Sequence, residues 1–143
     1  MPANTSPIFP KTAVIGIASI STASVIRSYS GSSTLSKILD AGADGTRIDS
    51  VEVIATASTT AGMVRLVLSD GTNYKLLDEV VVSAITVSGT VPAFTKTLSY
   101  PDAQSVGGTI INRAQLVLPT GWSLWCGTEK AEAFNVIAFG GNY

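Results

Sequence analysis

The stretch VRLVLSDGTNYKLL, residues 64–77, decides the fold class of this chain. Val64, Leu66 and Leu68 occupy every second position, and this spacing places all three on one face of a β-strand. The pair Asp70-Gly71 follows, and Asp-Gly is typical of a tight hairpin turn because glycine adopts positive φ angles without strain. A second apolar run then returns along the first. The stretch therefore predicts an antiparallel β-hairpin.

Runs of the same kind continue on both sides of this hairpin. Val, Ile and Thr are abundant in them, and their branched side chains suit a pleated sheet better than a helix. Residues 78–84 have some helical character, but their three consecutive valines favour a strand. The predicted strands are 13–20, 24–29, 35–39, 47–57, 63–69, 74–77, 80–87, 94–98, 110–118, 122–127 and 133–139.

Many short strands without alternating helices predict an all-β fold. The expected architecture is an antiparallel β-sandwich, jelly-roll-like, in which two sheets bury one core. Residues 12–143 are expected to form this single domain, because no composition break or fixed-period repeat divides them. The pattern does not give the order of the strands.

One strand has an irregular pattern. Ile48 is out of phase with Val51, Val53 and Ala55, which otherwise alternate along one face. A β-bulge inserts one extra residue and so shifts the alternation by one position. The pattern therefore predicts a bulge near Asp49-Ser50.

The alternation also predicts the core. Trp122 and Trp125 differ by an odd number of positions, so a strand would place them on opposite faces. We expect Trp122 inside and Trp125 on the surface or in an interface. Cys126 shares the inner face with Trp122 and is expected to behave as a small buried apolar residue. The predicted core is Val64, Leu66, Leu68, Leu116, Leu118, Trp122 and Leu124.

The composition excludes several classes of function. The 143 residues include 9 Lys and Arg against 10 Asp and Glu, so a net charge of −1 gives no basic surface for nucleic acid. Charged residues make up 13% of the chain and hydrophobic residues 45%, which argues against disorder. Histidine is absent and Cys126 is the one cysteine, which excludes a histidine base, a disulfide within the chain and a cysteine zinc cluster. We therefore expect no enzymatic activity, no catalytic residue, no cofactor and no bound metal.

The few candidates for site chemistry have simpler explanations. Asp40, Asp44 and Asp49 lie close together in the sequence, but they lack the ligand density of a calcium loop. They are expected in surface turns, where aspartate is favoured. The pair Ser36-Lys37 cannot act as nucleophile and base, because neighbours on a strand face opposite ways.

Residues 1–11 are expected to form an extended N-terminal arm. Prolines at positions 2, 7 and 10 disfavour helix, and the segment has neither the basic nor the apolar region of a secretory signal. Ile8 and Phe9 are large apolar residues that need cover, either from the end of their own sandwich or from a neighbouring subunit. No apolar run approaches the roughly 20 residues that a transmembrane helix needs, so no membrane partner is expected.

Trp125 and Tyr143 are the aromatic candidates for an interface, together with Ile8 and Phe9 of the arm. Aromatic residues are enriched where proteins meet. Trp122, Trp125 and Tyr143 are also candidates for a stacking platform for a sugar. If Trp125 and Tyr143 lie together on one exposed face, a carbohydrate site is favoured. If Trp125 is buried between subunits, a structural role is favoured.

Four segments resemble small structural proteins of tailed bacteriophage virions. They are PANTSPIFP at 2–10, AGADGTRI at 41–48, LPTGW at 118–122 and AFGGNY at 138–143. The likeness spans nearly the whole chain and is greatest to capsid decoration proteins, also called cement or auxiliary head proteins. It implies a β-rich, non-enzymatic protein that binds the outer head surface as a homotrimer. The implied partners are the chain itself and the major capsid protein. The implied location is the capsid surface of the virion, after synthesis in the host cytoplasm.

Other interpretations stay open. Within the virion, the chain also fits a tail, baseplate, neck or head-fibre component. A different class is a carbohydrate-binding β-sandwich used in host recognition. An enzyme is the third class, and it would need an acidic pair in a deep pocket.

Overall fold

The computed structural model describes residues 9–100, 105–106, 109–110 and 115–143. Within these ranges it contains eleven β-strands and no helix, which confirms the all-β prediction. The strands are β1 (Thr12–Ile20), β2 (Ser36–Asp40), β3 (Thr46–Ala55), β4 (Gly62–Ser69), β5 (Tyr74–Val82), β6 (Thr95–Ser99), β7 (Ser105–Val106), β8 (Thr109–Ile110), β9 (Leu116–Leu118), β10 (Ser123–Thr128) and β11 (Phe134–Asn142).

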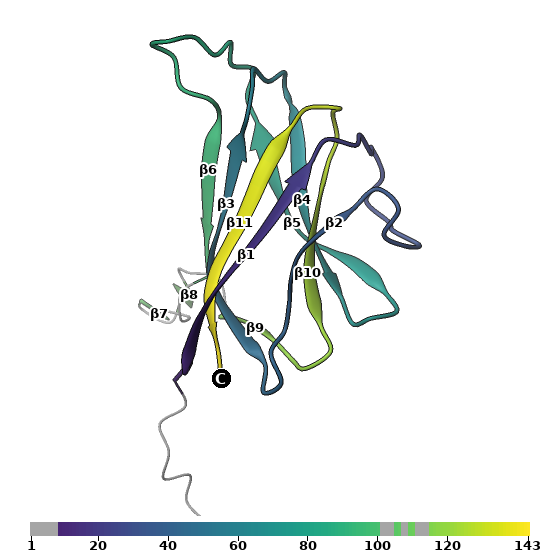
Figure 1. The fold of residues 1–143 in the computed structure, drawn as a ribbon, viewed down its shortest axis with the longest axis vertical. Helices are drawn as coiled ribbons and strands as arrows, with labels where there is room; N and C mark the ends of the chain where they lie inside the picture. Colours follow the sequence, from purple (N-terminus) through teal and green to yellow (C-terminus); the bar gives the residue numbers. More distant parts are fainter. Residues whose placement is uncertain (1–8, 101–104, 107–108, 111–114) are drawn as a thin grey trace, which may run out of the picture.

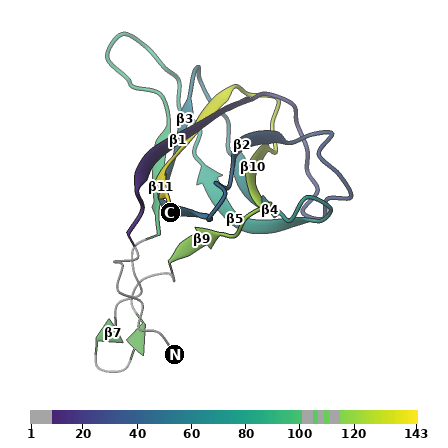
Figure 2. The ribbon, with the colours of Figure 1, turned by 60° about the horizontal axis from the view of Figure 1, so that its bottom comes forward.

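The strands form two main sheets, and every pair in them is antiparallel. In sheet A the order is β1-β11-β3-β6, and the short β9 also pairs with β3. In sheet B the order is β2-β10-β4-β5, while β7 and β8 pair with each other. Figure 1 shows the strands of sheet A side by side, and Figure 2 shows the two sheets facing each other in a sandwich-like arrangement.

The core lies between the two sheets. Val64, Leu66, Leu118 and Leu124 are buried in it, as predicted, and Cys126 joins them on the inner face of β10. The other predicted core residues are Leu68, Leu116 and Trp122, which pack against this core but are only partly buried. Trp122 precedes the first residue of β10, at the end of a turn, so one sheet covers its ring incompletely. Trp122 therefore contacts the core as predicted, but it is less buried than predicted.

The bulge predicted from the phase of Ile48 is confirmed. In the pairing of β3 with β11, Phe139 lies opposite Ser50 and Gly140 lies opposite Ile48, which leaves Asp49 as the extra residue. The shift lets Ile48 face the core together with Val51, Val53 and Ala55. Glycine is required on the partner strand, because a Cβ at Gly140 would collide with the carbonyl of Arg47.

A second bulge lies in β5 and was not predicted. Leu66 pairs with Asp78 and Val67 pairs with Leu76, so Leu77 is the extra residue. It joins the predicted strands 74–77 and 80–87 into one strand that ends at Val82. The prediction of two strands was wrong because a bulge breaks the period of two in the same way as a turn does.

The predicted hairpin between β4 and β5 is confirmed. Gly71 has a φ of 95°, which a residue with a Cβ adopts only with strain. The Asp70 carboxylate accepts hydrogen bonds from the backbone amides of Asn73 and Thr72, at 2.7 and 2.9 Å. These bonds, led by the one from Asn73, lower the pKa of Asp70 to about 2. The turn is therefore fixed by an ionised side chain over most of the pH range.

The strand predicted at 24–29 is absent. This part of the chain crosses the outer face of sheet B and touches it through two isolated bridges, between Ala23 and Thr128 and between Tyr29 and Tyr74. It was predicted as a strand because of its β-branched residues, but Val25 and Ile26 are exposed, and Tyr29 is the residue of 24–29 that is buried against the sheet.

The predicted strand 110–118 is only partly described. Residues 111–114 lie outside the described ranges, and β8 and β9 lie on either side of them. The predicted arm is likewise only partly described, since residues 1–8 lie outside these ranges. Its last residue, Lys11, already belongs to the domain, because its amide donates to the carbonyl of Asn142 at 2.7 Å.

Candidate interaction surface

The outer face of sheet A carries a regular grid of side chains. Strand register places one outward residue from each of β1, β11, β3 and β6 in the same row. Each of these residues is exposed or partly buried, whereas their neighbours on β1, β11 and β3 point into the core. Three consecutive rows are Ile15, Phe139, Ser50 and Ser99; Ile17, Ile137, Glu52 and Thr97; and Ser19, Asn135, Ile54 and Thr95.

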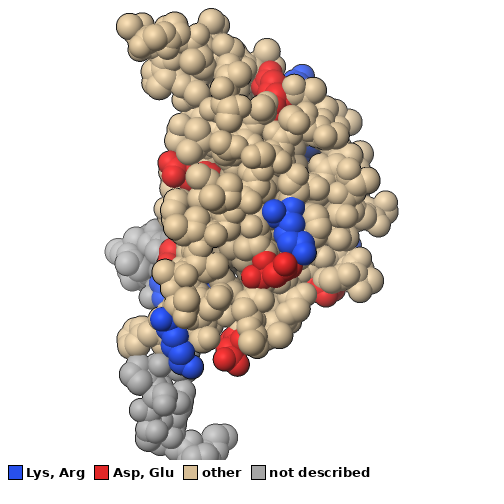
Figure 3. Space-filling model, viewed as in Figure 1, with Lys and Arg blue, Asp and Glu red and all other residues tan. Residues whose placement is uncertain are grey.

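This outer face is apolar at β1 and β11 and nearly free of charge. Ile15 and Ile17 are 60% and 63% exposed, and their cross-strand neighbours are Phe139 and Ile137. Glu52 is the one charged residue in the three rows. Figure 3 shows that the surface over β1 and β11 consists almost wholly of uncharged residues. A contiguous exposed apolar patch of this kind marks a protein interaction surface.

The position of β1 depends on Gly16. A Cβ at this position would lie 2.6 Å from the carbonyl oxygen of Ile38 on β2, so only glycine permits the close approach of the two strands. Because Gly16 points inward, Ile15 and Ile17 on either side of it point outward. The same contact that joins the edges of the two sheets therefore presents the apolar pair.

The sequence contains a signal for this face, although we had not predicted it. The run Ala-Val-Ile-Gly-Ile-Ala at 13–18 is apolar at every position, whereas a strand with one solvated face alternates. An uninterrupted apolar run predicts a strand that is covered on both faces. In β1 the described residues cover the inner face, and the outer face stays exposed.

A groove of about 470 Å³ lies at the end of the molecule where the chain finishes. The turn residues Asp44 and Gly45, the segment Val117, Leu118 and Pro119, and the ring of Tyr143 line it. The amide of Tyr143 donates to the carbonyl of Gly45 at 3.2 Å, which fixes the last residue against the turn. Tyr143, predicted as an interface residue, thus forms one wall of this groove.

The arm residues of the predicted interface have different outcomes. Ile8 lies outside the described residues. Phe9 is 71% exposed at the root of the arm. The next residue, Pro10, packs so closely on β11 that a Cβ at Gly141 would lie 2.5 Å from the Cβ of this proline. The arm therefore leaves the domain beside the C-terminal end of β11, with a large apolar side chain in solvent.

Trp125 lies on the outer face of sheet B and is covered by the chain itself. Its ring meets Tyr74 edge-to-face with centroids 5.4 Å apart, and the Lys37 ammonium lies 5.3 Å from its centroid. Its indole N–H donates to the Oγ of Ser123 at 2.7 Å. The residues that contact Trp125 are different from those that line the groove of Tyr143. The structure therefore does not form the joint aromatic platform on which a sugar site would depend.

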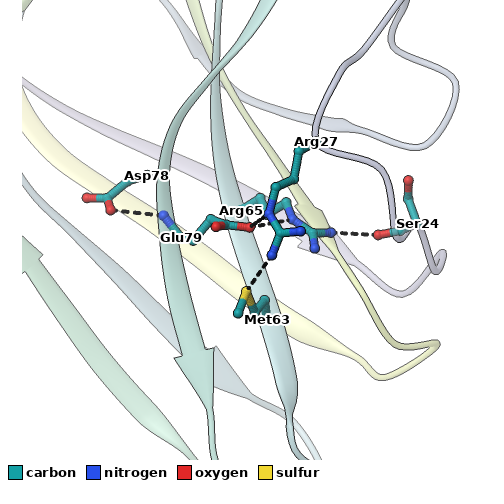
Figure 4. A network of polar contacts seen from close by, with 6 residues as sticks. All are labelled: Ser24, Arg27, Met63, Arg65, Asp78 and Glu79. Atoms are coloured by element: carbon teal, nitrogen blue, oxygen red, sulfur yellow. Dashed lines mark hydrogen bonds and ion pairs between the residues drawn. The ribbon is translucent and has the colours of Figure 1, made fainter.

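A buried arginine holds the segment 21–35 onto sheet B (Figure 4). Arg65 is 2% exposed; its Nε donates to Glu79 Oε1 at 2.9 Å and its Nη1 to the carbonyl of Ser24 at 2.7 Å. Arg27, on the crossing segment, donates to the same Glu79 oxygen at 2.7 Å. Tyr29, Leu35 and Val67 form a small apolar cluster beside this network.

This network and the inner face of β10 contain the main perturbed groups. The hydrogen bond from Arg65 lowers the pKa of Glu79, against an opposing effect of burial. Burial raises the pKa of the Cys126 thiol to about 12, so the thiol is protonated and shielded at neutral pH. Sequence reasoning missed Arg65, because the alternation of Val64, Leu66 and Leu68 identifies the inner face of the strand and gives no sign that its outer face is covered.

The other candidates for chemistry are dispersed. Asp40 pairs with Lys37 at 3.0 Å and Asp49 with Arg47 at 2.8 Å, while Asp44 lines the terminal groove. In the part of the chain that the structure describes, no three His, Cys, Asp or Glu side chains are grouped to hold a metal ion. Across those same residues, no helix has the length and apolarity to span a membrane. No protein-family model, curated protein or solved structure matches the chain.

Proposed function

We propose that the chain is a non-enzymatic structural protein of a tailed phage virion, a capsid decoration protein that binds the outer head surface as an oligomer. The observation that supports this most is the uncharged outer face of sheet A, with Ile15 and Ile17 exposed side by side on β1. A surface whose exposed residues are apolar and neutral gains free energy when a neighbouring protein covers it.

The low charge of this face suits contacts that repeat over a shell. An unpaired charge buried at each contact would cost several kcal/mol, so an interface formed many times favours neutral groups. Serine and threonine at the β6 side of the grid supply neutral hydrogen-bonding groups at the rim. Many weak copies of such a contact give strong attachment through multivalency.

The face is also well suited to binding without rearrangement. Four paired strands hold its side chains in fixed rows, and the buried core supports those strands from behind. A rigid surface loses little conformational entropy when a partner covers it. The proposed oligomer is a homotrimer, with the major capsid protein as the second partner. A tail, baseplate, neck or head-fibre position would use the same surface chemistry.

The experiment is co-sedimentation with undecorated shells of the phage that encodes the chain. Ile15→Ser with Ile17→Ser should weaken binding at least about tenfold, because two interface side chains are truncated. The matched control is Val25→Ser with Val81→Ser, two residues 72% and 70% exposed on the other side of the molecule. Equal loss in both variants, or unchanged binding of the first, would contradict the proposal.

A further inference from the structure

We propose that the groove beside Tyr143 is the receptor for the N-terminal arm of a second copy of this chain. This inference specifies how copies hold one another in the proposed oligomer, and in that respect it rests on the proposed function. It joins two exposed apolar features at the same end of the molecule, the groove and the arm root, into one contact.

The groove has the chemistry that recognises an extended proline-rich segment. Tyr143 supplies an aromatic wall, and Val117, Leu118 and Pro119 supply the apolar floor. Val117 is 40% exposed, although it belongs to a strand that pairs with β3. Aromatic-lined apolar grooves bind proline-rich chains because such chains are already extended and lose little entropy on docking.

The arm has the matching composition. Residues 2–9 contain two prolines, Ile8 and Phe9, and they contain no lysine, arginine, aspartate or glutamate. The described part already exposes Phe9, a side chain that gains free energy when covered. In an extended conformation of about 3.1 Å per residue, eight residues span roughly 25 Å.

The backbone at the arm root favours the arm of a second copy over the chain's own arm. The root lies beside the groove, because the amide of Lys11 donates to the carbonyl of Asn142, the residue before Tyr143. To enter its own groove, the arm would have to turn at this root and cross the end of β11 toward Val117 on β9. Between Pro7 and Thr12 there is no glycine, and Pro7 and Pro10 favour extended backbone around them, so a tight reversal there is disfavoured.

An arm that enters its neighbour's groove makes a head-to-tail contact. Such heterologous contacts close into a ring when the rotation between copies permits, and a trimer is the smallest ring in which donor and acceptor neighbours differ. Each copy then donates one arm and accepts one, so that no groove or arm stays uncovered.

Cysteine crosslinking of the full chain tests this contact. The Ile8→Cys, Val117→Cys double variant carries one thiol on the arm and one in the groove. Native Cys126 does not interfere, because it is buried and its thiol pKa is about 12. A short bis-maleimide should give covalent dimers and higher species on denaturing gels, in yields at least about fivefold above the Ile8→Cys, Val81→Cys control. Val81 is also a valine, it is 70% exposed on sheet B, and the control replaces it by the same residue.

Each outcome of this experiment decides the proposal. Links between copies that require the groove cysteine support it. Links only within one copy would show that the chain's own arm fills the groove, and no specific link would show that the arm binds elsewhere; either result overturns it. Sedimentation equilibrium adds a readout without crosslinking: Val117→Glu should weaken self-association at least about tenfold, and Val81→Glu should leave it unchanged.

The same variants separate this inference from the proposed function. If crosslinks form but shells do not bind the protein, the arm contact holds and the virion role fails. If no arm crosslink forms and Val117→Glu self-associates as the original protein does, while the protein still binds shells through sheet A, the virion role holds and the arm contact fails. Neither result depends on the other.

Discussion

The two sheets differ in how their outer faces are covered. On sheet B, the segment 21–35 lies over the sheet, and Arg65 beneath it is 2% exposed and bound to Glu79 and Ser24. On sheet A, Ile15 and Ile17 stand in solvent at 60% and 63% exposure. Around Arg65 the first face is covered by the chain itself, although Val25 and Val81 on that side stay exposed. The second is apolar and uncharged, as expected of a face completed by another molecule.

This difference teaches which residues serve stability and which serve assembly. A buried ion pair is costly to break, because removal of one partner leaves the other charge without compensation. An exposed apolar residue contributes little to the free energy of unfolding, because it is exposed in both states. Substitutions on sheet B should therefore change stability, and substitutions on sheet A should change binding.

The largest effect is expected at Glu79. Glu79→Ala removes the acceptor of Arg65 and Arg27, and leaves the buried Arg65 guanidinium bound to the Ser24 carbonyl without a negative partner from Glu79. The loss in the free energy of unfolding should be about 3–5 kcal/mol. Urea denaturation measures it. The control is Glu52→Ala on sheet A, which should stay within about 0.5 kcal/mol of the original protein. Equal losses in the free energy of unfolding for the two variants would show that the two outer faces do not differ in their contribution to stability.

A smaller effect is expected at Trp125. Trp125→Ala removes the edge-to-face contact with Tyr74 and the contact with the Lys37 ammonium. Because Trp125 is only partly buried, the cost should be about 2 kcal/mol, below the roughly 3–5 kcal/mol of a fully buried aromatic. Ile17→Ala should cost under about 0.5 kcal/mol. A thermal melt in which Ile17→Ala is the more damaging change would reverse the comparison.

The pH dependence of stability should sharpen it further. Hydrogen bonds from Arg65 and Arg27 lower the pKa of Glu79 below its ordinary 4.5, so folding favours the ionised form of this carboxyl group. This stabilisation is present above pH 4.5 and is lost as the pH falls through the lower folded-state pKa. Glu79→Gln should therefore flatten the acid limb of a stability profile measured by urea titration. An unchanged acid limb would show that the pair adds no pH-dependent stability.

The smallest effect is expected in the chemical reactivity of Cys126, which lies between the two sheets. Its thiol pKa of about 12 leaves about one thiolate in ten thousand at pH 8, and the side chain is buried. An aromatic disulfide reagent should therefore label Cys126 only as fast as the protein unfolds, and urea should restore full reactivity. Rapid labelling of the native protein would show that the inner face of β10 opens.

The sequence was sufficient for the features that depend on local pattern. The alternation of Val64 and Leu66, the phase of Ile48 and the Asp70-Gly71 turn predicted sheet, bulge and hairpin, and the structure has each of them. These features are set by neighbours within a few residues. Period-two spacing therefore identifies a strand's inner face without knowledge of its partner strands.

The covered and uncovered outer faces depend on contacts between distant parts of the chain. Arg65 lies on the outer face of its strand, and it is buried because a segment about forty residues earlier crosses over it. Val25 and Ile26 in that segment predicted a strand, yet both are exposed, since the segment uses Tyr29 and Leu35 to cover the sheet. For the same reason, the sequence predicted the correct side of the strand for Trp125 but did not predict its contacts with Tyr74 and Lys37.

The most direct test of the central claim is a cryo-EM map of the intact virion in which this chain is located. The account predicts that the outer face of sheet A, with Ile15 and Ile17, lies against the capsid shell. It predicts that Val25 and Val81, on the side of sheet B, face solvent. A map in which sheet A faces solvent and sheet B contacts the shell, or in which the particle lacks this chain, would contradict the account.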